Sequence, residues 1–306
     1  MEIDFLVETA KKLQNKDIAF FNIEGGEPFL VYGRLKKICG AIDERSEIWI
    51  NSTGDGISLE RLAELKKMNV TAIMFSLHNP EPAKFNMFMG IANAWQTMTN
   101  AIKLCHKVDI AVALNACLQK NDFYNGTFEG IMEQAKKFNA AIIQLIKPKS
   151  AGGWLEKGVG LFTTADINYI KKQVNKYNSE KQYKNYPAIS AQIIEEDRSV
   201  FGCTAGGTDR FYINAKGDVQ PCEFLNISFG NIQQEPFEKI YARMRSCFED
   251  PGECWLCERY SAEVLHLFKE NKLQSLPLNP ELSMKVYNNW DRGRKTELYQ
   301  CLKNIA

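Results

Sequence analysis

Five cysteines gather late in the chain, where their side chains can act together: Cys203, Cys222, Cys247, Cys254 and Cys257. Thiolates held close together in a reducing compartment bind a soft metal or an iron–sulfur cluster. A disulfide framework is the other common reason for such a set, but the acidic, amphipathic first residues show no export signal. A metal or cluster site is therefore favoured. The remaining cysteines are expected to be small buried apolar side chains: Cys39, Cys105, Cys117 and Cys301.

A predicted β-hairpin lies between the first two cysteines of this set. Residues 211–213 form a short apolar strand, residues 214–218 form a turn in which Gly217 supplies a positive φ, and residues 219–222 return. The hairpin brings Cys203 and Cys222 toward one site.

A second stretch that can do chemistry is Glu24-Gly25-Gly26-Glu27-Pro28, which follows an apolar run that ends at Phe21. Glycines at the end of a buried strand let the backbone approach a ligand closely or adopt a positive φ. The proline fixes the exit and removes one N–H. The bare N–H and C=O groups of such a turn can grip a small zwitterion, with Glu27 facing its ammonium group.

Short apolar strands alternate with amphipathic helices before these cysteines. Strands are predicted at 18–23, 48–50, 72–75, 110–114 and 141–146. Helices are predicted at 3–13, 32–43, from Ser58 onward, after a Pro-rich loop at 79–90, at 127–138 and at 164–177. Such alternation indicates a parallel sheet with right-handed crossovers. No G-x-G-x-x-G stretch supports a dinucleotide site, so the prediction is an α/β fold with a partial TIM-like (β/α) barrel and a small C-terminal cysteine-rich α+β domain.

Polar residues follow several predicted strands, at the rim where a β/α barrel binds its ligands. The candidates for cofactor contact there are Asn51, Thr53, Ser76 and Asn115. His78, one of only three histidines, is expected to be a loop histidine. With so few histidines, a zinc-dependent barrel hydrolase is not supported.

Composition excludes several classes of protein. The 306 residues carry a net charge of +1, 45% hydrophobic residues and 25% charged residues, which suits a globular chain with a sizeable core. No basic field indicates a nucleic-acid partner, and no polybasic or long apolar run indicates a membrane. We expect a cytoplasmic protein.

The Gly25-Gly26-Glu27-Pro28 turn resembles that of radical S-adenosylmethionine (radical SAM) enzymes. The C-x13-G-x4-C hairpin from Cys203 to Cys222, with the later C-x6-C-x2-C, resembles the SPASM or twitch extension of that family. The resemblance implies S-adenosylmethionine held by the turn and by the rim residues named above, and radical chemistry on a peptide, a protein residue or a heme-like precursor. It also implies an electron donor such as flavodoxin or ferredoxin.

An auxiliary [4Fe–4S] cluster is the metal group that the resemblance implies, with Cys203, Cys222, Cys254 and Cys257 as ligands and Cys247 in reserve. Four cysteines that include a C-x2-C pair also suit structural zinc, so zinc stays the alternative. The corresponding division of the chain is a barrel at 1–185, a cluster domain at 186–275 and a helical tail at 276–306.

One feature of the family is missing. Its members carry C-x3-C-x2-C after the first barrel strand, and neither that triplet nor that strand occurs in these 306 residues. Those thiolates hold the cluster that splits S-adenosylmethionine, so the chain as given lacks the cysteines for that step. Either Met1 is an internal methionine of a longer chain, or the protein is a degenerate relative. In the second case it is a non-catalytic barrel with a structural metal site of four cysteines, acting as a binding or scaffold protein.

Overall fold

The computed structural model describes residues 1–156, 162–249 and 251–303, in two compact units. The barrel unit comprises Met1–Ile146 and Phe162–Ala191, and the cysteine unit comprises Lys147–Leu161 and Gln192–Ala306. Each unit is described by itself. The boundaries at residues 185 and 275 drawn from the sequence stay predictions.

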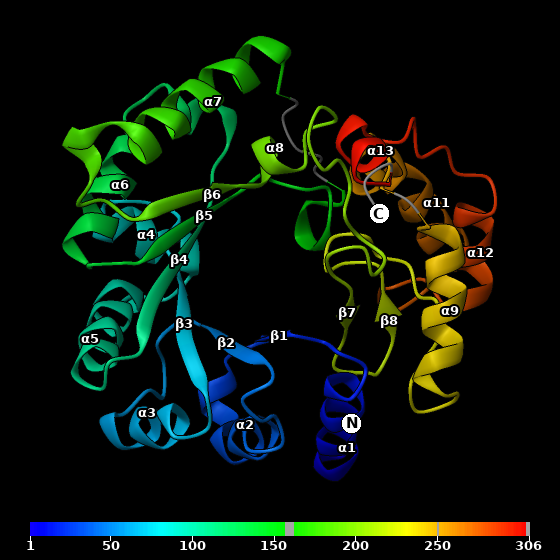
Figure 1. The fold of residues 1–306 in the computed structure, drawn as a ribbon, viewed down its shortest axis with the longest axis horizontal. Coiled ribbons are helices and arrows are strands. Elements are labelled where there is room, and N and C mark those ends of the chain that lie inside the picture. The colour runs from blue at the N-terminus through cyan, green and yellow to red at the C-terminus, as the bar shows by residue number, and fades with distance from the viewer. Residues whose placement is uncertain (157–161, 250, 304–306) are drawn as a thin grey trace. The chain divides into compact units, whose positions relative to one another are not determined.

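The barrel unit is a curved sheet of six parallel strands in the order β1-β2-β3-β4-β5-β6, with helices along its outer side (Figure 1). The strands are β1 Phe20–Ile23, β2 Glu47–Ser52, β3 Val70–Ser76, β4 Ala111–Cys117, β5 Ile142–Ile146 and β6 Ala188–Ala191. The helices are α1 Ile3–Gln14, α2 Tyr32–Cys39, α3 Leu59–Lys66, α4 Pro82–Met89, α5 Ala94–Lys107, α6 Thr127–Lys137 and α7 Thr164–Ser179, with single turns of 3-10 helix at Pro28–Val31, Lys120–Phe123 and Lys181–Tyr183. The predicted partial β/α barrel is confirmed.

The core of the barrel unit lies between the sheet and the apolar faces of the helices. Helix α5, for example, buries Met98, Ile102 and Cys105 at the spacing of one helix face. Strand β3 buries Ile73 and Phe75 completely. Because all six strands run parallel, their carboxyl ends meet at one edge, and the residues that follow them form the rim of the barrel.

Two elements of the barrel unit differ from the prediction. Strand β6 lies in a segment whose polarity indicates a domain boundary, because only Ile189 and the two alanines of Ala188–Ala191 mark a strand there. The Pro-rich loop predicted at 79–90 contains helix α4. Its Pro82 occupies the first helical turn, where a missing N–H costs nothing, and Gly90 ends the helix in a left-handed conformation.

The cysteine unit is built on the predicted hairpin, which is confirmed. Strands β7 Tyr212–Ile213 and β8 Val219–Gln220 pair antiparallel, and Gly217 in the turn has φ +89°. Around them lie a 3-10 turn at Gly152–Trp154 and the helices α8 Gln192–Glu195, α9 Phe237–Cys247, α10 Leu256–Arg259, α11 Ser261–Glu270, α12 Pro280–Tyr287 and α13 Glu297–Lys303.

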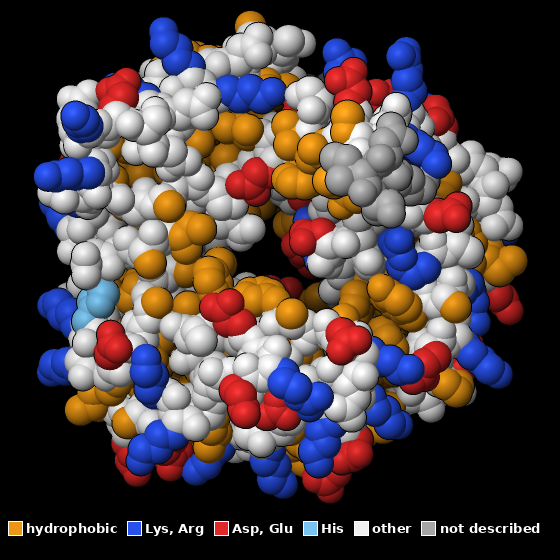
Figure 2. Space-filling view, viewed as in Figure 1, with side chains coloured by type: hydrophobic (Ala, Val, Ile, Leu, Met, Phe, Trp, Pro, Cys, Tyr) orange, Lys and Arg blue, Asp and Glu red, His pale blue; other side chains and the backbone are white. Residues whose placement is uncertain are grey.

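The surface carries charges of both signs. On the face shown in Figure 2, Lys and Arg side chains are interspersed with Asp and Glu side chains. No helix in the described ranges combines the length and the apolar character that a bilayer crossing requires.

Candidate cofactor and metal sites

The first candidate site is the glycine corner, Gly25-Gly26, directly after β1. Gly25 has φ +110° and Gly26 has φ +50°, so an L side chain would be strained at both positions. Apart from its own chain neighbours, no heavy atom of the described residues lies within 4 Å of where a Cβ atom would stand on either glycine. The corner therefore presents bare backbone to open space, which is what a small ligand at the rim needs.

Glu27 fixes this corner to the end of β2. Its Oε1 atom accepts hydrogen bonds from the Phe29 N–H (3.1 Å) and the Ser52 hydroxyl (2.9 Å). Its Oε2 atom accepts from the N–H and the hydroxyl of Thr53, each at 2.6 Å. Both carboxylate oxygens of Glu27 accept hydrogen bonds from the protein, so Glu27 and Thr53 position the glycine corner. Pro28 begins the buried 3-10 turn that follows. Direct contact of Glu27 with an ammonium group stays a prediction.

Asn51 is the rim residue with an unused group. Its Nδ2 atom donates to Glu24 Oε2 (2.8 Å), which holds the amide in one orientation. Its Oδ1 atom is buried and accepts no hydrogen bond from the described residues. A buried acceptor without a donor is destabilising, so this oxygen suits a ligand that brings an N–H or O–H group.

Ser76 and Asn115 lie side by side at the ends of β3 and β4, paired in register. Asn115 is 8% exposed, and the structure gives neither side chain a hydrogen bond to a described residue. The next turn is closed by His78, whose Nδ1 atom accepts from the Cys117 N–H (3.1 Å). Burial lowers the pKa of His78 to about 4, so the ring is neutral near pH 7.

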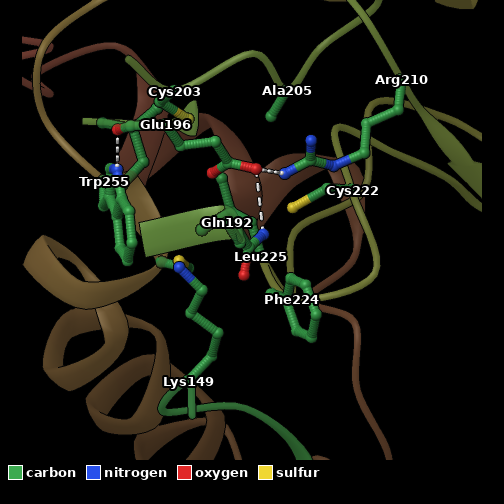
Figure 3. A pocket seen from close by; sticks show the side chains of 12 residues that line it. Lys149, Gln192, Glu196, Cys203, Ala205, Arg210, Cys222, Phe224, Leu225 and Trp255 are labelled. Carbon is green, nitrogen blue, oxygen red and sulfur yellow. Dashed lines mark hydrogen bonds and ion pairs between the residues drawn. The ribbon is translucent and has the colours of Figure 1, made fainter. Parts of the chain in front are cut away.

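The second candidate site is a cavity in the cysteine unit, lined by Cys203, Cys222 and Cys257. Figure 3 labels the first two of these cysteines. Cys203 is held by its N–H, which donates to the Gly252 carbonyl (2.9 Å). Cys222 follows the return strand β8, and Cys257 lies in α10. All three are at most 9% exposed. The cavity is about 10 Å³, room for about one water molecule, so its walls must part when a larger group is loaded.

Two of these cysteines, Cys222 and Cys257, are held as neutral thiols by their burial. Burial raises the pKa of Cys222 well above its usual value and raises that of Cys257 to about 12. A metal ion displaces such protons, because it binds the thiolate. Three cysteine side chains that line one buried cavity are a donor set suited to iron–sulfur chemistry.

The other two cysteines of the set lie outside this lining. The Cys254 sulfur accepts from Arg259 Nη1 (3.0 Å), and its N–H donates to the Arg292 carbonyl (3.1 Å). Cys247 ends α9, and burial raises its thiol pKa. Cys254 as the fourth ligand, with Cys247 in reserve, stays a prediction.

A single-ion site would look different. Among the described residues, no three His, Cys, Asp or Glu side chains are grouped tightly enough to hold one metal ion. A zinc site gathers four ligands about 2.0–2.3 Å from one ion, whereas a [4Fe–4S] cluster spreads its ligands over four iron atoms. The iron–sulfur cluster stays a prediction for this set of cysteines, with zinc as the alternative.

Several functional candidates in the cavity escape sequence analysis. They are Lys149, Gln192, Glu196, Arg210 and Trp255, all of which line it. Glu196 and Arg210 form an ion pair across it. The Lys147-Pro148-Lys149 run after a predicted strand is visible in the sequence, but nothing there places it beside cysteines more than fifty residues away.

Comparisons with known proteins identify two domain families in the chain. Residues 1–135 match the family model of the radical SAM superfamily, and residues 203–259 match that of SPASM, an iron–sulfur cluster-binding domain. The chain is similar to AdoMet-dependent heme synthases: 22% identical over 282 residues in Nitratidesulfovibrio vulgaris (84% of this chain, 75% of the relative) and 21% over 267 residues in Methanosarcina barkeri (77% and 73%).

Two solved structures have the same fold. One is anSMEcpe with bound AdoMet (TM-score 0.60, 15% identity), which matches 99% of this chain and 86% of its own. The other is Streptococcus suis SuiB bound to the precursor peptide SuiA (TM-score 0.61, 15% identity, 79% of this chain). The match spans 58% of the length of SuiB.

Proposed function

This chain belongs to the radical SAM superfamily and carries a SPASM iron–sulfur domain, and from that premise we propose that it takes part in radical modification of a peptide, a protein residue or a heme-like precursor. The names of its relatives, heme synthases and a peptide-bound SuiB, support this substrate range. We place the protein in the cytoplasm, with flavodoxin or ferredoxin as electron donor. The observation that carries the proposal is the convergence of Cys203, Cys222 and Cys257 in one buried cavity.

The barrel rim is the proposed S-adenosylmethionine site. The described residues leave open space on the Cβ side of Gly25 and Gly26, and we propose that the backbone carbonyls of this corner accept from the ammonium group of the cofactor. The buried Asn51 Oδ1 atom is a further acceptor without a donor among the described residues. Ser76 and Asn115 offer polar groups to the rest of the molecule. Glu27 holds the corner and Thr53 in place through its four hydrogen bonds.

The cysteine cavity is the proposed auxiliary [4Fe–4S] site. Cys203, Cys222 and Cys257 would supply three thiolates and Cys254 the fourth. When bound, such a cluster supplies one-electron chemistry or a Lewis-acidic iron. The chain's own residues exclude water from it, because the lining includes the side chains of Phe224, Leu225 and Leu256. No C-x3-C-x2-C triplet is present in these 306 residues, so cleavage of S-adenosylmethionine is not assigned to any residue here.

The experiment that tests the proposal follows 5′-deoxyadenosine. The native gene product is purified without oxygen, its iron and sulfide are measured, and it is incubated with dithionite and S-adenosylmethionine. We expect 5′-deoxyadenosine to form. Fully loaded protein that forms none would reject the enzymatic proposal.

We propose as the second candidate a non-catalytic binding or scaffold protein with a structural four-cysteine metal site. It predicts tightly held metal, no 5′-deoxyadenosine, and loss of folding when the metal is removed by a chelator. The same native sample decides between the two proposals.

A further inference from the structure

Lys149 carries a buried positive charge that no acidic side chain of the described residues pairs. The residue is 5% exposed. Its Nζ atom is fully buried and donates no hydrogen bond to any described residue. It lies 3.2 Å from the centroid of the Trp255 ring. The indole N–H donates to the Glu196 carbonyl (2.6 Å), so the ring is held in place beneath the ammonium group.

The neighbouring cations are paired, which sets Lys149 apart. Lys147 also lies over the Trp255 ring (3.9 Å), but it forms an ion pair with Glu258. Arg210 forms an ion pair with Glu196 across the cavity. In the described part of the chain, Lys149 has neither an ion pair nor a hydrogen bond.

A charge in this position needs an anion. Moving an ammonium group out of water is costly, and the face of an aromatic ring recovers only part of that cost. The side chain of Lys149 extends into the cavity beside Trp255 and toward Gln192 (Figure 3). The cavity is lined by three cysteines, and the ammonium of Lys149 lowers the pKa of Cys257 against the larger effect of burial. Glu196, the carboxylate of the cavity lining, is already paired with Arg210, so the anions left for Lys149 are the thiolates that bind a metal group.

We propose that Lys149 is the counter-cation of the auxiliary cluster and raises its reduction potential. The inference rests on the proposed function, because it requires a cluster on Cys203, Cys222 and Cys257. A thiolate-bound cluster gains one negative charge when it is reduced. A fixed cation in a site of low dielectric constant stabilises the reduced form more than the oxidised form. Trp255 is the positioning residue, because its ring shields the Lys149 ammonium group from water and holds it beside the cluster site.

The test measures the reduction potential of the auxiliary cluster in the full chain, reconstituted without oxygen and followed by EPR during a redox titration. Lys149→Met removes the charge and keeps the length of the side chain. Lys149→Arg keeps the charge. Lys269→Met removes an exposed charge of the same unit, one that pairs with Glu156 on the surface.

We expect Lys149→Met to shift the potential to more negative values at unchanged iron and sulfide content. Lys149→Arg should stay near the parent protein, and Lys269→Met should not shift. An unchanged potential in fully loaded Lys149→Met, or an equal shift in Lys149→Arg, would overturn the inference. If the parent protein takes up no iron and sulfide, the proposed function itself fails, which is a different outcome.

If the Lys149→Met chain binds too little cluster for a redox titration, a second measurement tests the inference. Thermal unfolding is compared between cluster-free and loaded samples of each variant. Since the unpaired charge destabilises the empty cavity, cluster-free Lys149→Met should melt no lower than the parent protein. It should also gain less in melting temperature on loading. An equal or larger gain would contradict the role of Lys149.

Discussion

The Glu27 carboxylate accepts two hydrogen bonds from Thr53, one from its N–H and one from its hydroxyl, each at 2.6 Å. This contact joins the glycine corner after β1 to the end of β2. Because both oxygens of Glu27 already accept hydrogen bonds from the protein, this carboxylate fixes the shape of the rim. The acceptors that we propose for a ligand are therefore the backbone of the glycine corner and Asn51 Oδ1.

Glu27→Gln should therefore weaken the fold of the barrel unit. The amide has the same size as the carboxylate. Its NH2 group cannot accept a hydrogen bond, however, and would face an N–H or O–H group that donates to Glu27 in the parent protein. We expect a loss of about 1–3 kcal/mol in the free energy of unfolding, measured by urea denaturation of the cluster-free chain. Glu44→Gln, at an exposed loop position, is the control and should change little. Equal losses in both variants would show that Glu27 does not fix the corner.

Asn51→Ala should reduce affinity for S-adenosylmethionine by roughly tenfold, because a ligand N–H loses a buried acceptor. Calorimetric titration of the anaerobic protein measures the change in Kd. Asn22→Ala is the matched control, since Asn22 also donates to Glu24 (3.5 Å) but is exposed. If both variants bind equally well, Asn51 does not contact the cofactor.

His78 should make the barrel unit sensitive to acid. Its pKa is lowered to about 4 in the folded chain, against about 6.5 in the unfolded chain. The neutral ring therefore stabilises the fold fully above pH 6.5, and this contribution disappears as the pH falls through about 4, to a total of up to about 3 kcal/mol. Unfolding free energies measured from pH 7 to 4 should fall less steeply in His78→Gln. Parallel curves for the two proteins would contradict this assignment.

Replacing each of the two cysteines outside the cavity lining should have a different effect on the iron and sulfide bound by the chain. Cys254→Ser should lower the iron and sulfide bound per chain, since we propose Cys254 as the fourth ligand. Cys247→Ser should bind as much as the parent protein. Mössbauer spectra of ⁵⁷Fe-loaded samples show whether the cubane signal survives. The reverse pattern would make Cys247 the ligand.

The sequence predicts the parallel sheet, the hairpin and the radical SAM and SPASM resemblance, because apolar periodicity and fixed cysteine spacing are local signals. Strand β6 escapes because its four residues include only one large apolar side chain. Lys149 and Arg210 escape for a different reason. Their importance comes from contacts with cysteines and acidic residues that are distant in the chain, and no local pattern encodes such contacts.

The hydrogen-bond partners of Glu27 are a third feature that the sequence does not predict. Its residue type suggests contact with an ammonium group, while its partners in the fold are Phe29, Ser52 and Thr53. Spacing identifies a carboxylate at the rim, but only the folded backbone decides which donors reach it first.

The most direct test of the central claim is the iron and acid-labile sulfide content of the reconstituted chain and of Cys203→Ser, Cys222→Ser and Cys257→Ser. Cys301→Ser is the control, because Cys301 is exposed, contrary to the burial predicted for it from the sequence. The account predicts a complete [4Fe–4S] cluster in the parent and control proteins and a severe loss in each of the three variants. Zinc without sulfide in the parent protein, or full clusters in the three variants, would contradict it.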